Sequence, residues 1–134
     1  MKDVVIVDSV RTGLAKAFRG SFNLTRSDDM LAHCIDSLLE RNPNMGADEV
    51  EDVVVGAASH AGEQDGNLAR LAVILSKLPV TAAGVTINRF CSSGLQSIAI
   101  AANQIASGQT EVAIAGGVDS ISMRTRQEPG KAKQ

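Results

Sequence analysis

The sequence predicts an α/β protein in which short strands alternate with amphipathic helices around a mostly parallel sheet. Apolar runs rich in valine and isoleucine begin at Val4, Val53, Gly84 and Val112. Between these runs, apolar residues recur with the helical period of about 3.6 residues. The resulting order, β-α-β-α-β-α-β, is typical of parallel strands joined by helical crossovers.

Two of the predicted strands, Val4 to Val7 and Val53 to Val55, are continuous apolar runs. Such runs are typical of strands that are buried on both faces. Residues 84–88 form a weaker strand, in which apolar residues alternate with Thr86. Residues 112–115 form the fourth, which ends at two glycines.

Three helices are predicted, near Asp28 to Arg41, over Asn67 to Lys77, and from Cys91 to Ser107. Ser27 and the two aspartates after it are expected to cap the first helix, and Asn42-Pro43 to end it. Small residues line much of the third helix, which therefore suits burial on two sides inside a larger body. Its expected buried stripe consists of Leu95, Ile98, Ala99, Ala102 and Ile105.

Composition excludes several classes of function. The chain has 134 residues, 44% of them hydrophobic and 21% charged, which indicates one soluble globular domain. A net charge of −2 and the absence of tryptophan and tyrosine argue against a nucleic-acid partner. No apolar run approaches the roughly 20 residues of a membrane span, and the N-terminus is not a signal peptide. Two widely separated cysteines therefore suggest free thiols in the cytoplasm.

Cys91 is the main candidate for catalysis. It stands where a buried strand ends and a helix begins, and the unpaired N–H groups of a helix start favour thiolate over thiol. Ser92, Ser93 and Gly94 open the helix and leave room for a substrate, while first-turn N–H groups can hold an oxyanion. The alternative is a buried structural cysteine.

Other reactive residues carry weaker signals. Cys34 lies on the apolar stripe of the first helix and is predicted to pack in the core, with His33 in solvent. His60 lies in a polar loop beyond a strand end, where α/β proteins bind ligands, but has no local partner. Asp119 is expected in a turn or a cap. The sequence has no metal-ligand spacing and no phosphate-binding glycine motif.

The segment Asn88-Arg89-Phe90-Cys91-Ser92-Ser93-Gly94-Leu95-Gln96 resembles the nucleophile segment of the thiolases, or acetyl-CoA C-acyltransferases. The resemblance covers residues 3–123. It includes Val5 to Thr12, Phe18 to Phe22, Asn67 to Arg70 and Ala115 to Met123. The opening is more similar to the degradative 3-ketoacyl-CoA thiolases than to the biosynthetic enzymes. Gly13 departs from the proline that is usual in the family.

The resemblance implies two similar halves, each with strand order 3-2-1-4-5 and a cysteine helix packed between the two sheets. It implies that Cys91 takes an acyl group from a 3-ketoacyl-CoA, releases acetyl-CoA and passes the acyl group to coenzyme A. Acyl-CoA and coenzyme A would be substrates, and no bound cofactor is expected. The full-length protein would be a homo-oligomer in fatty acid metabolism.

Family members are roughly three times as long as this chain. By the resemblance, their activating histidine, second cysteine and most coenzyme A contacts lie outside the matching residues. We therefore expect residues 1–123 to be a partial thiolase-like N-terminal domain that is inactive alone. Residues 124–134 leave the family pattern and are expected to be a disordered or non-native tail.

Two alternatives remain open at this point. A ketoacyl-synthase-type condensing enzyme also starts a helix with a reactive Cys-Ser-Ser, although Asn88-Arg89 and Gly94-Leu95-Gln96 are more thiolase-like. The other alternative is a non-catalytic half-domain that associates with itself through an apolar face.

Overall fold

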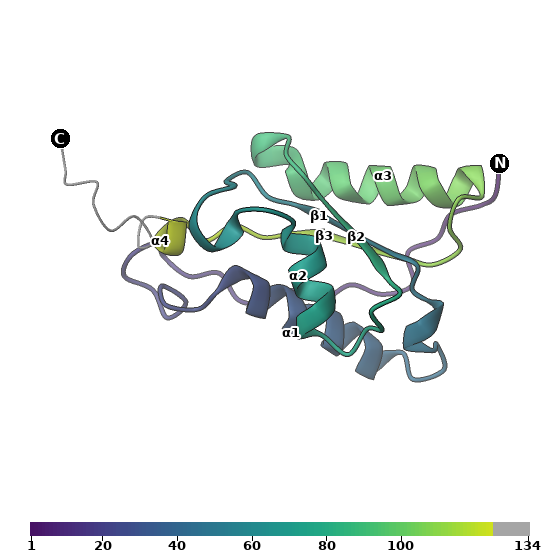
Figure 1. The fold of residues 1–134 in the computed structure, drawn as a ribbon, viewed down its shortest axis with the longest axis horizontal. Coiled ribbons are helices and arrows are strands. Elements are labelled where there is room, and N and C mark those ends of the chain that lie inside the picture. Colours follow the sequence, from purple (N-terminus) through teal and green to yellow (C-terminus); the bar gives the residue numbers. More distant parts are fainter. Residues whose placement is uncertain (125–134) are drawn as a thin grey trace.

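The computed structural model describes residues 1–124 and contains helices on both faces of a parallel sheet (Figure 1). The α-helices are α1 (Ser27–Arg41), α2 (Leu68–Leu75), α3 (Ser93–Ser107) and α4 (Ile121–Arg124). The strands are β1 (Asp52–Gly56), β2 (Ala83–Ile87) and β3 (Ala113–Gly117). Short 3-10 turns occur at Ala47–Glu49 (η1), Gly62–Gln64 (η2) and Phe90–Ser92 (η3).

The strand β1 lies at the centre of the sheet. The strand order is β2-β1-β3, and both pairings are parallel, with Val54 opposite Val85 on one side and Ala115 on the other. The helix α3 covers one face of the sheet, and α1 and α2 cover the opposite face (Figure 1). The predicted α/β class with a mostly parallel sheet is confirmed.

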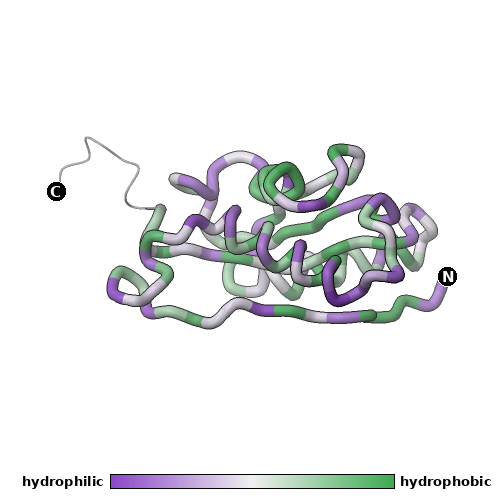
Figure 2. The backbone as a smooth tube through the Cα atoms, turned by 90° about the horizontal axis from the view of Figure 1, so that it is seen from below, coloured by the Kyte–Doolittle hydropathy of each residue, from purple (hydrophilic) through white to green (hydrophobic). Residues whose placement is uncertain are grey.

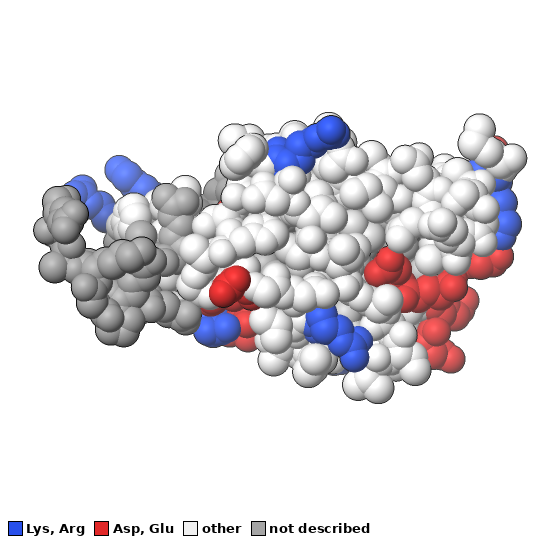
Figure 3. Space-filling model, turned by 45° about the horizontal axis from the view of Figure 1, so that its top comes forward, with Lys and Arg blue, Asp and Glu red and all other residues white. Residues whose placement is uncertain are grey.

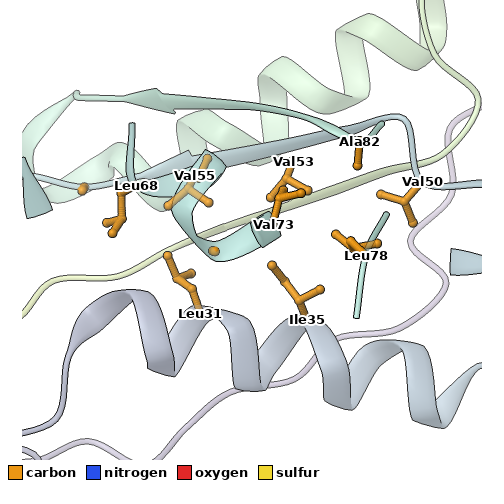
Figure 4. Close-up of a cluster of buried hydrophobic side chains, with 12 residues drawn as sticks. Leu31, Ile35, Val50, Val53, Val55, Leu68, Val73, Leu78 and Ala82 are labelled. Atoms are coloured by element: carbon orange, nitrogen blue, oxygen red, sulfur yellow. The ribbon is translucent and has the colours of Figure 1, made fainter. Parts of the chain in front are cut away.

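The apolar core lies between the sheet and the pair α1 and α2 (Figure 4). Val53 and Val55 point into it and meet Ile35 of α1 and Val73 of α2. Because successive strand residues face opposite sides, Val54 points toward the α3 face, and it is also fully buried. Burial on both faces explains why β1 is a continuous run of valines.

The helix α1 ends at Arg41, with Asn42 as its C-cap as predicted, but its start is capped differently. The N-cap residue is Arg26, whose side chain does not cap the helix. Instead Glu63, from η2, accepts hydrogen bonds from the Ser27 N–H (2.9 Å) and the Ser27 hydroxyl (2.8 Å). A carboxylate at this place interacts favourably with the positive end of the helix dipole. The capping residue is thus 36 positions away in the sequence.

The helix α3 turns small residues toward the sheet rather than its predicted apolar stripe. Its buried residues are Ser93, Ser97 and Ala101, whereas Leu95 is 72% exposed. The predicted stripe is wrong at Leu95, Ile98 and Ala99, which are exposed, while Ala102 and Ile105 are half-buried. Figure 3, in which the side of the molecule bearing α3 comes forward, shows few charged side chains over much of the surface.

The reason is the close approach of α3 to the strand ends. A Cβ on Gly56 would lie 2.3 Å from the carbonyl group of Ser93, and a Cβ on Gly117 would lie 3.0 Å from Cα of Gly94. Only small residues fit where two backbones come this close. Ser97 completes the contact, because its hydroxyl oxygen lies 2.7 Å from the carbonyl oxygen of Gly116.

The predicted strand from Val4 to Val7 is wrong, because these residues are extended but belong to no strand. The family strand order would place them beside β1, yet both edges of β1 are already bonded to β2 and β3. Lys2 is held by the Ala106 carbonyl (3.1 Å). At the other end, Asp8 forms an ion pair with Arg41 (2.8 Å).

Between these two tethers the N-terminal segment stays outside the sheet. It runs along one border of the molecule (Figure 2), and Val5, Ile6 and Val7 are 75–79% exposed. A mostly apolar slot of about 780 Å³ separates residues 3–17 from β3, α1 and α3. A hydrogen bond from Asn42, with the neighbouring Arg41 charge, lowers the pKa of Asp8.

Among residues 1–124, no helix has both the length and the apolar character needed to cross a bilayer. The tail predicted for residues 124–134 lies outside the described residues, except for its first residue, which ends α4.

The close approach at Gly56 predicts a sharp difference between two glycine substitutions. Gly56→Ala places a methyl group inside the Ser93 backbone, so we expect it to lower the free energy of unfolding by about 3 kcal/mol or more. Gly116→Ala is the matched control, because a Cβ there meets nothing within 4 Å. Urea unfolding followed by circular dichroism measures both, and equal midpoints would contradict the packing described.

Candidate active site

Cys91 lies in the 3-10 turn η3, between the end of β2 and the start of α3. Its side chain is exposed, so the thiol is not a core residue. The residue before it, Phe90, has a φ of 49°, a left-handed conformation that costs roughly 1–2 kcal/mol for a residue with a side chain. The structure therefore bends the chain sharply at the position that presents Cys91.

Asn88 and Ser93 hold the N–H groups of this bend, and the exposed Ser92 hydroxyl donates to the Arg89 carbonyl (3.0 Å). Asn88 accepts a hydrogen bond from the Phe90 N–H (2.8 Å). The Ser93 hydroxyl accepts from the Arg89 N–H (2.8 Å) and donates to the Phe90 carbonyl (2.6 Å). Ser93 is only 3% exposed, so its hydroxyl depends on these backbone partners. Backbone strain at Phe90 is thus balanced by local hydrogen bonds.

An open depression of about 260 Å³ lies beside Cys91. Gly56 and Gly117, at the ends of β1 and β3, contribute to it, and Phe90 and Asp119 also line it. The depression is therefore at the carboxyl edge of the parallel sheet, where α/β proteins bind their ligands. Three of its lining residues are glycines, which bring no side chain into the space beside the thiol.

The start of α3 provides fewer free N–H donors than expected. The Ser92 N–H donates to the Arg89 carbonyl (3.2 Å), and the Ser93 N–H donates to the Phe90 carbonyl. Both donors are engaged in the 3-10 turn. An oxyanion at this site would have to use the N–H of Cys91 itself or compete with the turn.

The structure does not bring the two histidines or the second cysteine to Cys91. His60 is exposed, lies outside the depression and has Nε2 3.0 Å from the Ala57 carbonyl oxygen. His33 is exposed on α1, across the sheet from α3. Cys34 is half-buried beside the N-terminal slot, and burial raises the pKa of its thiol.

Sequence reasoning missed Gln64 and underrated Asp119. Asp119 lines the depression and accepts three hydrogen bonds, one of them from the fully buried side chain of Gln64. The two residues are 55 positions apart, and no local pattern connects them. In the described part of the chain, no group of three or more His, Cys, Asp and Glu side chains is placed to hold a metal ion.

Comparison with known proteins identifies the family. Residues 4–134 match the family described as Thiolase, N-terminal domain. The chain belongs to the thiolase family. A thiolase N-terminal domain accounts for the parallel α/β fold, and the matching family model is that of the thiolases, the first of the families considered above.

Individual thiolases are similar over most of this chain. The "Beta-ketoadipyl-CoA thiolase" of Pseudomonas putida is 45% identical over 122 residues, which are 91% of this chain and 30% of that protein. The "3-oxoadipyl-CoA/3-oxo-5,6-dehydrosuberyl-CoA thiolase" of Escherichia coli K12 is 41% identical with the same coverage. The "3-ketoacyl-CoA thiolase" of Aliivibrio salmonicida is 41% identical over 121 residues, 90% of this chain and 31% of that protein. The chain thus spans about 30% of the length of the curated relatives it matches.

The geometry of the bend predicts a role for Ser93 in stability. Ser93→Ala leaves the Arg89 N–H without its acceptor, so we expect a loss of about 1–2 kcal/mol of unfolding free energy. Ser92→Ala is the matched control, since the Ser92 hydroxyl donates to the Arg89 carbonyl (3.0 Å) at an exposed position where water can replace it, and we expect a change within about 0.5 kcal/mol. Thermal unfolding compares the two, and an equal loss in both variants would contradict the role of Ser93.

Proposed function

We propose that Cys91 is the nucleophile of a thiolase-type acyltransferase that acts on 3-ketoacyl-CoA. The observation that carries the proposal is the exposed thiol at a strained strand-to-helix bend, beside an open depression. Membership of the thiolase family supports the reaction class.

The reaction has two steps, in which Cys91 is first acylated and then released. The Cys91 sulfur attacks the C3 carbonyl carbon, the bond between C2 and C3 breaks, and acetyl-CoA leaves after its C2 carbon takes up a proton. The sulfur of coenzyme A then attacks the carbonyl carbon of the new thioester. The bond between that carbon and the Cys91 sulfur breaks, the Cys91 thiolate departs, and an acyl-CoA two carbons shorter than the substrate is released. This is covalent, ping-pong catalysis.

The described residues contribute the nucleophile and its surroundings, but no base. The glycines at the ends of β1 and β3 are proposed to make room for the acyl group, and the Cys91 N–H is the proposed donor to an oxyanion. By the family resemblance, the histidine that takes the thiol proton and the second cysteine lie outside this stretch. Each such acid–base group supplies about 10²–10⁴-fold in rate.

The cellular setting is part of the same proposal. Two free thiols suit a reducing cytoplasm. Acyl-CoA and coenzyme A are the proposed substrates, and the full-length protein is proposed to be a homo-oligomer. The relatives carry the names of 3-ketoacyl-CoA and β-ketoadipyl-CoA thiolases, so an acyl-CoA degradation step, of which fatty acid breakdown is one case, is the proposed role.

Acylation of the isolated chain tests the nucleophile. For each thiol, the measured quantity is the rate of acylation by acetyl-CoA divided by the rate of alkylation by iodoacetamide. We expect this ratio to be about tenfold or more higher for Cys91 than for free glutathione, because the proposed site aligns the thiol with a carbonyl group. Peptide mass spectrometry resolves Cys91 from Cys34. Cys34 should react slowly in both assays near neutral pH, since its raised pKa keeps it protonated until the pH is well alkaline. A ratio equal to that of glutathione would overturn the proposal.

Turnover is a separate expectation. Because residues 1–124 place no histidine beside Cys91, we expect no measurable thiolysis of acetoacetyl-CoA by residues 1–134 alone. Loss of the enolate absorbance of acetoacetyl-CoA follows the reaction. Robust turnover that disappears in Cys91→Ser would contradict this expectation.

A further inference from the structure

Asp119 joins the end of β3 to the loop after β1. Its Oδ2 accepts the Ala58 N–H (2.9 Å), and its Oδ1 accepts the Ser59 N–H (3.1 Å). The same Oδ1 accepts from Nε2 of Gln64 (3.1 Å). A carboxylate that accepts three N–H donors fixes the relative position of the segments that carry them.

Gln64 holds the Asp119 carboxylate through a buried amide side chain. Its side chain is 0% exposed and every polar atom is bonded, because Nε2 also donates to the Ser59 carbonyl (2.7 Å) and Oε1 accepts the Ser120 N–H. Gln64 thus bonds Asp119, the next residue Ser120 and the loop residue Ser59. We call Asp119 and Gln64 together the clamp.

The clamp reaches Cys91 through Ala58 and Asn88. The N–H of Ala58 donates to Asp119, and the carbonyl of Ala58 accepts from Nδ2 of Asn88 (3.2 Å). The other side-chain atom of Asn88, Oδ1, accepts the N–H of Phe90 (2.8 Å). Phe90 is the residue in the left-handed conformation that directly precedes Cys91. A continuous series of hydrogen bonds therefore connects Asp119 with the bend.

We propose that Asp119 and Gln64 are positioning residues for Cys91, which hold Ala58 and Asn88 so that Phe90 keeps its left-handed conformation and the thiol faces the depression. Two observations support this, namely the series of hydrogen bonds from Asp119 to the bend and the position of Asp119 in the lining of the depression. The inference rests on the proposed acyl transfer to Cys91. A left-handed Phe90 persists only where its surroundings determine it.

The test separates alignment of the thiol from its accessibility. In Asp119→Ala we expect the rate of Cys91 acylation by acetyl-CoA to fall about tenfold or more, because a misplacement of about 1 Å costs on the order of a hundredfold in an aligned reaction. Alkylation of Cys91 by iodoacetamide, which needs no alignment with the depression, should change by less than about twofold. Asp119→Glu keeps both acceptor oxygens and should recover most of the acylation rate.

The controls distinguish positioning from loss of structure. Asp65→Ala removes an exposed aspartate that bonds only the adjacent Gly66 N–H, and it should leave both rates unchanged. Alkylation of the half-buried Cys34 reports unfolding in every variant. If Asp119→Ala exposes Cys34, the isosteric Asp119→Asn, which keeps one acceptor oxygen, replaces it with the same expected selective loss.

The outcomes divide cleanly. A selective loss of acylation in Asp119→Ala or Asp119→Asn, with recovery in Asp119→Glu, supports the clamp. Equal acylation in Asp119→Ala and the unchanged chain overturns the clamp but leaves the proposed nucleophile intact. If Cys91 in the chain without substitutions has the same ratio of acylation to alkylation rate as glutathione, the proposed function is overturned, and the clamp with it.

Discussion

The first turn of α3 lies on the backbone of the strand ends rather than on side chains, because Gly56, Gly94 and Gly117 meet there. This contact sets the height of α3 above the sheet. It also decides which residues α3 can bury, since Ser93 and Ser97 fit the gap and Leu95 does not. The depression beside Cys91 is formed by the same glycines. Fold and candidate site therefore depend on one close approach of backbones.

Local patterns were sufficient for much of the fold and for the position of Cys91 between a strand and a helix. The valine run of β1 predicted a strand buried on both faces, and its residues have almost no exposure. The bend at Cys91 was readable because its cause is local, namely a strand that ends one turn before a helix of small residues begins. Signals of this kind depend on residues close in sequence, and they identify elements better than they identify neighbours.

The remaining features depend on distant partners and had no local signal. The run Val4 to Val7 is suited to burial, but its place is decided by the tethers at Lys2 and Asp8. The α1 cap is Glu63 rather than the nearby aspartates. The apolar spacing of α3 favoured a buried stripe beginning at Leu95, yet the close backbone contact leaves room for Ser93 and Ser97 instead. Asp119 read as a turn residue because Gln64 and Ala58 are far away in sequence.

The central position of β1 has a consequence for the order of folding. Val54 pairs with Val85 and with Ala115, and the second pairing closes a loop about twice as long as the first. A doubling of loop length adds about 0.6 kcal/mol of entropic cost. We expect β1 and β2 to associate first, with the bend at Cys91 made early. The bend that presents the Cys91 thiol would then form before the depression beside it. Docking of β3, which brings Gly117 and Asp119, would be the step that completes the candidate site.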